Sequence, residues 1–189
     1  MEIVLIIGSY LFGSLSPARL VGRAKGVDLT ENGTQNPGAT NVYKLIGRNW
    51  GITVAFMDLF KGMIPALIAR LYFYEEPLVY LMTGVAVVVG HDWPIFYGFK
   101  GGRGLASSLG VFLVLNCRLI FFTTFVSLAI SAYLKNKYGE RIRIPFSLYP
   151  LLIFTNLFFL RNWFLLLYTS VLMIISFYRA WQVRHKLQD

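Results

Sequence analysis

The chain has 189 residues, of which 56% are hydrophobic, 16% aromatic and only 14% charged. A soluble domain carries roughly a quarter charged residues, so this composition excludes an ordinary soluble domain, and the high hydrophobicity excludes a disordered chain. The single cysteine, Cys117, excludes an internal disulfide and a multi-cysteine metal site. The net charge is +9, and its meaning depends on where the basic residues lie along the chain.

Apolar stretches long enough to cross a bilayer recur along the chain. A helix of about 20 residues spans a hydrocarbon core of about 30 Å. In chain order, spans are expected at about 3–21, 51–71 and 78–97, then as two short spans within 105–134, and at 146–160 and 163–178. The stretch 105–134 is divided at 116–118 because Arg118 would otherwise lie at mid-bilayer, which costs several kcal/mol. The first stretch lacks the basic start of a cleaved signal peptide, so we expect it to be retained.

The distribution of basic residues supports about seven transmembrane helices. With the N-terminus outside, this count places fifteen of the 18 Lys and Arg residues on the inner side, together with the C-terminus. A single span over 105–134 would scatter them over both sides. We therefore predict an all-α integral membrane protein with one domain over 1-189, and the charge needs no nucleic-acid partner.

The first inner loop, 22–50, is long and rich in Asn, Thr and Gly, especially over 33–41. These residues supply amide and hydroxyl groups and permit tight turns that bring backbone N–H groups together. Residues 41–47 are expected to form a short helix that carries Lys44. From composition alone, a solvated connecting loop is an equally good interpretation.

The second inner loop, 98–104, contains four glycines with Lys100 and Arg103, and an apolar helix is expected directly after it from Leu105. Glycines allow backbone N–H groups to approach a phosphate, and the helix dipole adds positive potential. The loop lacks the Gly-Lys-Ser/Thr ending of a Walker A loop. It is either an anion site or a flexible turn with two cations.

Three polar residues inside the predicted spans, Asp58, Lys61 and His91, are candidates for a structural role. Asp58 and Lys61 lie one helical turn apart and are expected to pair. His91 closes the third span, where a histidine is more often a hydrogen-bonded structural residue than a base. No His, Cys, Asp or Glu cluster has metal-ligand spacing, so no metal is expected.

Four blocks in order, 33–42, 58–62, 90–94 and 98–104, resemble the bacterial acyl-phosphate:glycerol-3-phosphate acyltransferases, which are small membrane enzymes with seven spans. The resemblance is close over about 8–115 and rests mostly on hydropathy beyond. It implies transfer of a fatty acyl group from acyl phosphate to the 1-hydroxyl of glycerol 3-phosphate, giving lysophosphatidic acid and phosphate. It also implies a cytoplasmic-face active site in a bacterial cell membrane, with no metal, cofactor or coenzyme A.

The resemblance further implies roles for individual residues, position by position. The implied catalytic residues are Thr34, Lys44, Arg103 and Ser147. The implied phosphate-binding residues are Asn36, Gly38, Asn41, Lys100, Gly101 and Gly102, with the backbone N–H groups of Gly101 and Gly102 cradling the acyl phosphate. The candidate proton acceptors are His91 and a substrate phosphate oxygen. Thr34, Lys44 and Arg103 stand where the family usually has serine, arginine and lysine.

The C-terminal segment departs from the family, because Ala180 and Val183 occupy the places of a family His and Asn. An inactive or weakened relative that binds phospholipid or acyl phosphate is therefore one alternative, and a small membrane transporter is another. A transporter is expected to place polar residues or broken helices at mid-bilayer. Here the polar blocks lie at one interface.

Overall fold

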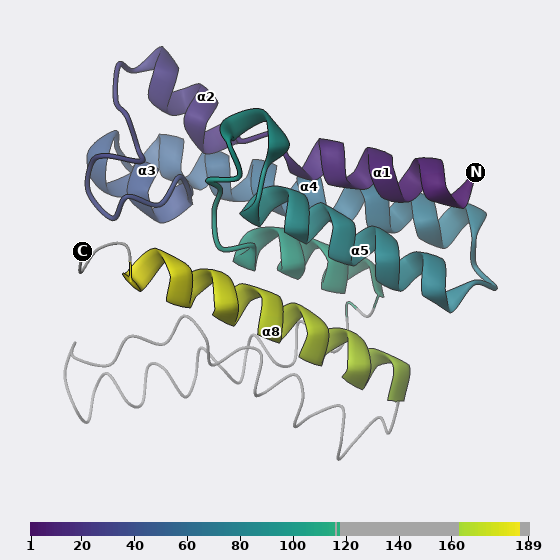
Figure 1. Cartoon of the computed structure of the whole chain (residues 1–189). Coiled ribbons are helices and arrows are strands. Elements are labelled where there is room, and N and C mark those ends of the chain that lie inside the picture. Colours follow the sequence, from purple (N-terminus) through teal and green to yellow (C-terminus); the bar gives the residue numbers. More distant parts are fainter. Residues whose placement is uncertain (116, 118–162, 186–189) are drawn as a thin grey trace, which may run out of the picture.

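The computed structural model describes residues 1–115, 117 and 163–185, and every regular element within these residues is helical (Figure 1). The elements are α1 (Glu2–Gly13), α2 (Pro17–Ala24), α3 (Ala39–Leu45), α4 (Arg48–Tyr72), α5 (Pro77–Asp92), the 3-10 helix η1 (Ile95–Tyr97), the helix Leu105–Leu115 and α8 (Trp163–His185). The predicted turn at 116–118, the predicted span at 146–160 and Ser147 lie outside the described residues.

Three described segments are long and apolar enough to cross a membrane, namely Glu2–Ala24, Arg48–Tyr72 and Pro77–Tyr97. They correspond to the first three predicted spans. Large apolar side chains cover the outer faces of the first two, as at Ile3 and Phe56, which are 73% and 58% exposed. Such exposure is costly in water but suits a lipid environment.

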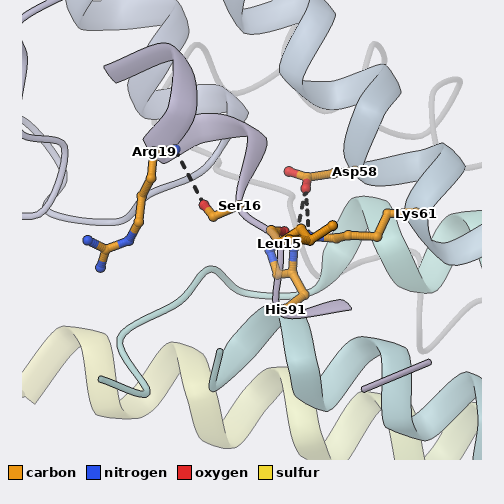
Figure 2. A network of polar contacts seen from close by, with 6 residues as sticks. All are labelled: Leu15, Ser16, Arg19, Asp58, Lys61 and His91. Atoms are coloured by element: carbon orange, nitrogen blue, oxygen red, sulfur yellow. Dashed lines mark hydrogen bonds and ion pairs between the residues drawn. The ribbon is translucent and has the colours of Figure 1, made fainter. Parts of the chain in front are cut away.

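The first of these segments is interrupted, which its hydropathy did not predict. Helix α1 ends at Gly13 and α2 begins at Pro17, because proline suits the first helical turn and Ser16 caps it. The Ser16 hydroxyl accepts the Arg19 N–H at 3.4 Å (Figure 2). Helix α2 then buries Ala18 on one face and exposes Arg23 on the other.

Helix α5 is the centre of the described bundle and packs against α1, α4 and α8 (Figure 1). Its Val87 and Val88 are fully buried with Tyr168 and Leu172 of α8. The helix Leu105–Leu115 adds Val111 to the same core. This core holds α8 against α5 and the helix Leu105–Leu115.

The helix Leu105–Leu115 approaches α4 closely through two glycines. A side chain at Gly62 of α4 would run into the Ser107 carbonyl, and one at Gly110 would run into the Leu59 carbonyl. Small residues let the backbones of membrane helices come this close. The contact holds the N-terminal end of the helix Leu105–Leu115 beside α4.

The polar loops gather at one end of the bundle, opposite the N-terminus (Figure 1). Helix α3 lies there with α2 and the C-terminal end of α8. It confirms the short helix that was expected at 41–47. The loop 98–104 lies at the same end, and the helix Leu105–Leu115 follows it as the sequence predicted. Loops far apart in sequence therefore share one end of the molecule.

Candidate functional site

A cavity of about 380 Å³ lies between the first loop, α3 and the start of the helix Leu105–Leu115. Its lining residues are Thr34, Asn36, Gly38, Ala39, Thr40, Lys44, Asp58, His91, Arg103, Gly104, Leu105 and Ala106. Six of the catalytic, phosphate-binding and proton-accepting candidates from the sequence thus meet around one space: Thr34, Asn36, Gly38, Lys44, His91 and Arg103. They come from four segments of the chain.

The first loop is folded by Asn41, which is fully buried and does not line the cavity. Its Oδ1 accepts the Thr34 N–H at 2.9 Å, and its Nδ2 donates to the carbonyls of Leu29 and Asn32, both at 3.0 Å. One amide side chain therefore ties three points of the loop to α3. In this structure Asn41 positions Thr34 at the cavity, whereas the sequence resemblance implied that it binds phosphate itself.

Replacing Asn41 with alanine is expected to destabilise the protein by about 2–3 kcal/mol, because three hydrogen bonds of this buried side chain, worth about 1 kcal/mol each, are lost. Thermal unfolding in detergent measures the change. The control is Asn32→Ala, which removes an exposed hydrogen bond to the Asp28 carbonyl and should leave the unfolding temperature nearly unchanged. Equal unfolding temperatures for the two variants would contradict the assigned role.

The start of the same loop is held by Asp28, whose Oδ1 accepts both the hydroxyl and the N–H of Thr30 at 2.7 Å. These hydrogen bonds stabilise the carboxylate and lower the pKa of Asp28 below its usual value. The first loop therefore begins in a side-chain-stabilised turn.

Asn36 brings an unsatisfied polar atom to the cavity. Its Oδ1 is buried and has no hydrogen-bond partner in the described part of the chain. A buried acceptor without a partner costs about 1–3 kcal/mol, so such atoms usually serve a bound molecule or water. A hydroxyl group on a ligand in the cavity would satisfy it.

The positive side of the cavity combines two cations with a helix N-terminus. Lys44 and Arg103 line it together with Gly104, Leu105 and Ala106, where the helix Leu105–Leu115 begins. The first N–H groups of a helix have no partner within it, and the helix dipole favours an anion there. This arrangement suits a phosphate.

The turn at Gly101 and Gly102 differs from the expectation that its N–H groups cradle a phosphate. The Gly101 N–H donates to the Asp92 carbonyl at 3.2 Å, and the Gly102 N–H donates to the His91 carbonyl at 3.0 Å. Both groups thus satisfy the last carbonyls of α5. The part of this loop that lines the cavity begins directly after the turn, at Arg103.

Lys100 is also separated from the other cations. It lines a neighbouring pocket of about 220 Å³. The other lining residues of that pocket are Thr30, Glu31, Gln35, Pro37, Gly101, Arg179 and Gln182. The Lys100 carbonyl accepts from Nη2 of Arg19 at 2.6 Å, which ties the loop to α2. Lys100 therefore lines a different pocket from Lys44 and Arg103.

Asp58 and His91, which line the cavity, form a buried polar network with Lys61 (Figure 2). Lys61 Nζ lies 3.1 Å from Asp58 Oδ1 and 3.0 Å from His91 Nδ1, and it donates to the Leu15 carbonyl at 2.7 Å. His91 Nδ1 is 3.4 Å from the same Asp58 oxygen. The Asp58–Lys61 pair predicted from the sequence is confirmed. The participation of His91 and Leu15 had no sequence signal, because they lie on other segments.

His91 faces two partners of the network through Nδ1, the Lys61 ammonium at 3.0 Å and the Asp58 carboxylate at 3.4 Å. An ammonium only donates and a carboxylate only accepts, so the tautomer of His91 decides which of the two Nδ1 bonds. Its Nε2 lies beside Gly102. Nδ1 is therefore engaged within the network.

No group of three His, Cys, Asp or Glu side chains could hold a metal ion within 1–115, 117 and 163–185. The polar groups that line the cavity are two cations, amide and hydroxyl groups, the Asp58 carboxylate and the His91 imidazole.

A family model described as glycerol-3-phosphate acyltransferase matches residues 3–188. The chain is 44% identical over 126 residues to the glycerol-3-phosphate acyltransferase of Aquifex aeolicus, covering 67% of this chain and 66% of that protein. It is 48% identical over 113 residues to the one from Geotalea daltonii, covering 59% and 57%. The matched segments thus span 66% and 57% of these two relatives, less than two thirds of each.

Two crystal structures of PlsY, an integral membrane glycerol 3-phosphate acyltransferase, are similar over 99% of this chain at 33% identity. The glycerol 3-phosphate form has a TM-score of 0.85 with 92% of its chain covered, and the lysophosphatidic acid form has 0.82 with 91%. With the apolar helices described above, this similarity shows that the chain is a helical membrane protein.

Proposed function

We propose that this chain, which belongs to the glycerol-3-phosphate acyltransferase family, transfers a fatty acyl group from acyl phosphate to the 1-hydroxyl of glycerol 3-phosphate. The products are lysophosphatidic acid and phosphate, and the reaction is an acylation in phospholipid synthesis. The names of the relatives and the two ligand forms of PlsY support the acceptor and the product. The observation that carries the proposal is the cavity where Lys44, Arg103 and a helix N-terminus surround one space.

The charge of the cavity fits two anionic substrates. Acyl phosphate and glycerol 3-phosphate repel one another when their phosphates come close, and this repulsion is stronger away from bulk water. Lys44 and Arg103 offset it, and the N–H groups at the start of the helix Leu105–Leu115 add to them. In this proposal Thr34 supplies a hydroxyl donor and Asn36 accepts from the glycerol moiety.

The proposed step is direct transfer in one ternary complex. The 1-hydroxyl oxygen of glycerol 3-phosphate attacks the acyl carbonyl carbon and forms the ester bond. The bond from that carbon to the phosphate oxygen breaks, and phosphate leaves with the electron pair. Because phosphate is a good leaving group, the protein acts chiefly by alignment and by stabilising developing charge, with Arg103 closest to this role.

The hydroxyl proton is proposed to go to a substrate phosphate oxygen. The alternative acceptor from the sequence, His91, lines the cavity, but its Nδ1 is engaged with Lys61 and Asp58 in the buried network. A phosphate oxygen is already at the reacting centre. Ser147 lies outside the described residues, and its proposed role rests on the family resemblance alone.

The remaining proposals concern the membrane. Seven spans, an outside N-terminus, a cytoplasmic C-terminus and one acyltransferase domain over 1-189 are supported by the distribution of basic residues. The cavity would then face the cytoplasm in a bacterial cell membrane, with the acyl chain among the helices. The proposed reaction uses no metal, cofactor or coenzyme A.

The proposal is tested with the purified full-length protein in lipid vesicles. Acyl phosphate together with glycerol 3-phosphate should release inorganic phosphate and form lysophosphatidic acid, and acyl-coenzyme A should not replace acyl phosphate. Binding of both substrates without product would indicate the inactive relative. Glycerol 3-phosphate movement across the vesicle membrane without acylation would indicate a transporter.

A further inference from the structure

The Gly101–Gly102 turn is held from the side of α8 by Arg179. Its Nη2 donates to the Gly101 carbonyl at 3.1 Å, and its Nε donates to the Gly102 carbonyl at 3.2 Å. Arg179 is only 7% exposed. Two neighbouring carbonyls are thus bound by one planar group, a geometry that arginine allows and lysine does not.

The Arg179 guanidinium is itself held in place by its surroundings. Its Nη1 donates to Gln182 Oε1 at 3.0 Å, and the same oxygen accepts from Nε1 of Trp93 at 3.2 Å. The guanidinium also lies over the Trp93 ring, 5.5 Å from its centre. The orientation of the group is therefore determined before any ligand binds.

The turn is consequently bound on both sides. Its N–H groups donate to the carbonyls of Asp92 and His91 at the end of α5, and its carbonyls accept from α8. Directly after it come Arg103 and the start of the helix Leu105–Leu115, which line the cavity. Any shift of the turn therefore moves the positive side of the cavity.

We infer that Arg179 is a positioning residue that places Arg103 and the helix N-terminus for phosphate binding by clamping the Gly101–Gly102 turn. This inference rests on the proposed acyl transfer for its kinetic consequence. Arg179 also lines the smaller pocket with Lys100, so direct binding of a ligand there is the competing explanation. The two explanations differ in whether kcat or KM changes.

The test uses the full chain in lipid vesicles with Arg179→Lys and Arg179→Gln. A misplacement of about 1 Å can cost about a hundredfold in rate, so we expect kcat to fall about ten- to a hundredfold in both variants. KM for glycerol 3-phosphate should stay within about twofold, because the turn carries Arg103, which is proposed to act on the leaving phosphate, whereas Asn36, which is proposed to accept from the glycerol moiety, lies on another loop. Added guanidinium should partly restore kcat in Arg179→Ala.

The matched controls are Arg23→Lys and Arg23→Gln on the exposed face of α2, which should behave as wild type.

A wild-type kcat in Arg179→Lys would overturn the inference, and so would a rise in KM with unchanged kcat. If the Arg179 variants do not fold, Gln182→Leu replaces them, since it frees the guanidinium on one side and should lower kcat in the same way.

A second readout separates this inference from the proposed function. Inorganic phosphate should raise the unfolding temperature of the wild type more than that of Arg179→Lys, whether or not the protein transfers acyl groups. Equal shifts would contradict the clamp.

Discussion

Replacing Arg103 with alanine is expected to lower the rate of acyl transfer from acyl phosphate by about 10²- to 10³-fold, the usual loss when one group that stabilises developing charge is removed. Arg103 lines the cavity beside the helix N-terminus, and the substitution removes one of the two Lys or Arg side chains among the described lining residues. Phosphate release from acyl phosphate and glycerol 3-phosphate in vesicles measures the effect. The protein should remain folded, because Arg103 is only partly buried.

Arg103→Lys is the matched control, since it keeps the charge and changes only the donor geometry. The acyltransferases that this chain resembles usually have lysine at this position, so we expect most of the activity to remain. Equal activity in Arg103→Ala and the wild type would refute the assignment of Arg103 to the reaction. Loss of activity in Arg103→Lys as well as in Arg103→Ala would show that a bidentate contact is required.

Replacing Lys61 with methionine is expected to destabilise the fold by about 3–5 kcal/mol, because it leaves the Asp58 carboxylate as an uncompensated charge in the interior. Both side chains are 4% exposed and lie 3.1 Å apart. The loss also removes the donor to the Leu15 carbonyl, at the break between α1 and α2. Thermal unfolding in detergent should show a larger decrease for Lys61→Met than for Asn41→Ala.

The double variant Asp58→Asn with Lys61→Met separates charge from packing. Once the carboxylate is neutral, the cost of burying it disappears, and much of the lost stability should return. An unfolding temperature as low as that of Lys61→Met alone would mean that the ammonium contacts to Leu15 and His91 matter more than the charge.

The elements that could be predicted from the sequence are those that depend on consecutive residues. Hydropathy located three membrane-crossing segments, and the Asn-, Thr- and Gly-rich loop leads into the expected short helix, α3. Helical spacing predicted the pair of Asp58 and Lys61, because residues three apart share a face. The positions of these elements follow from local composition and period.

Features that depend on distant segments could not be predicted in this way. His91 joins Lys61 only because α4 and α5 pack together, and the N–H groups of Gly101 and Gly102 are used by α5 rather than left for a ligand. Arg179 reaches the same turn from a helix 77 residues along the chain. No spacing in the sequence records these contacts.

The sequence alone therefore determined that this is a helical membrane protein whose cations and glycines gather in a few loops, because burial in lipid and helical period act on neighbouring residues. The tertiary structure decided which polar groups face the cavity and which hold the backbone. Thr34, Asn36, Lys44 and Arg103 were brought to one space, while Asn41 was given to folding its loop. An N–H group that donates to a carbonyl of the protein is not available to a ligand, and only the packed chain shows which N–H groups are used in this way.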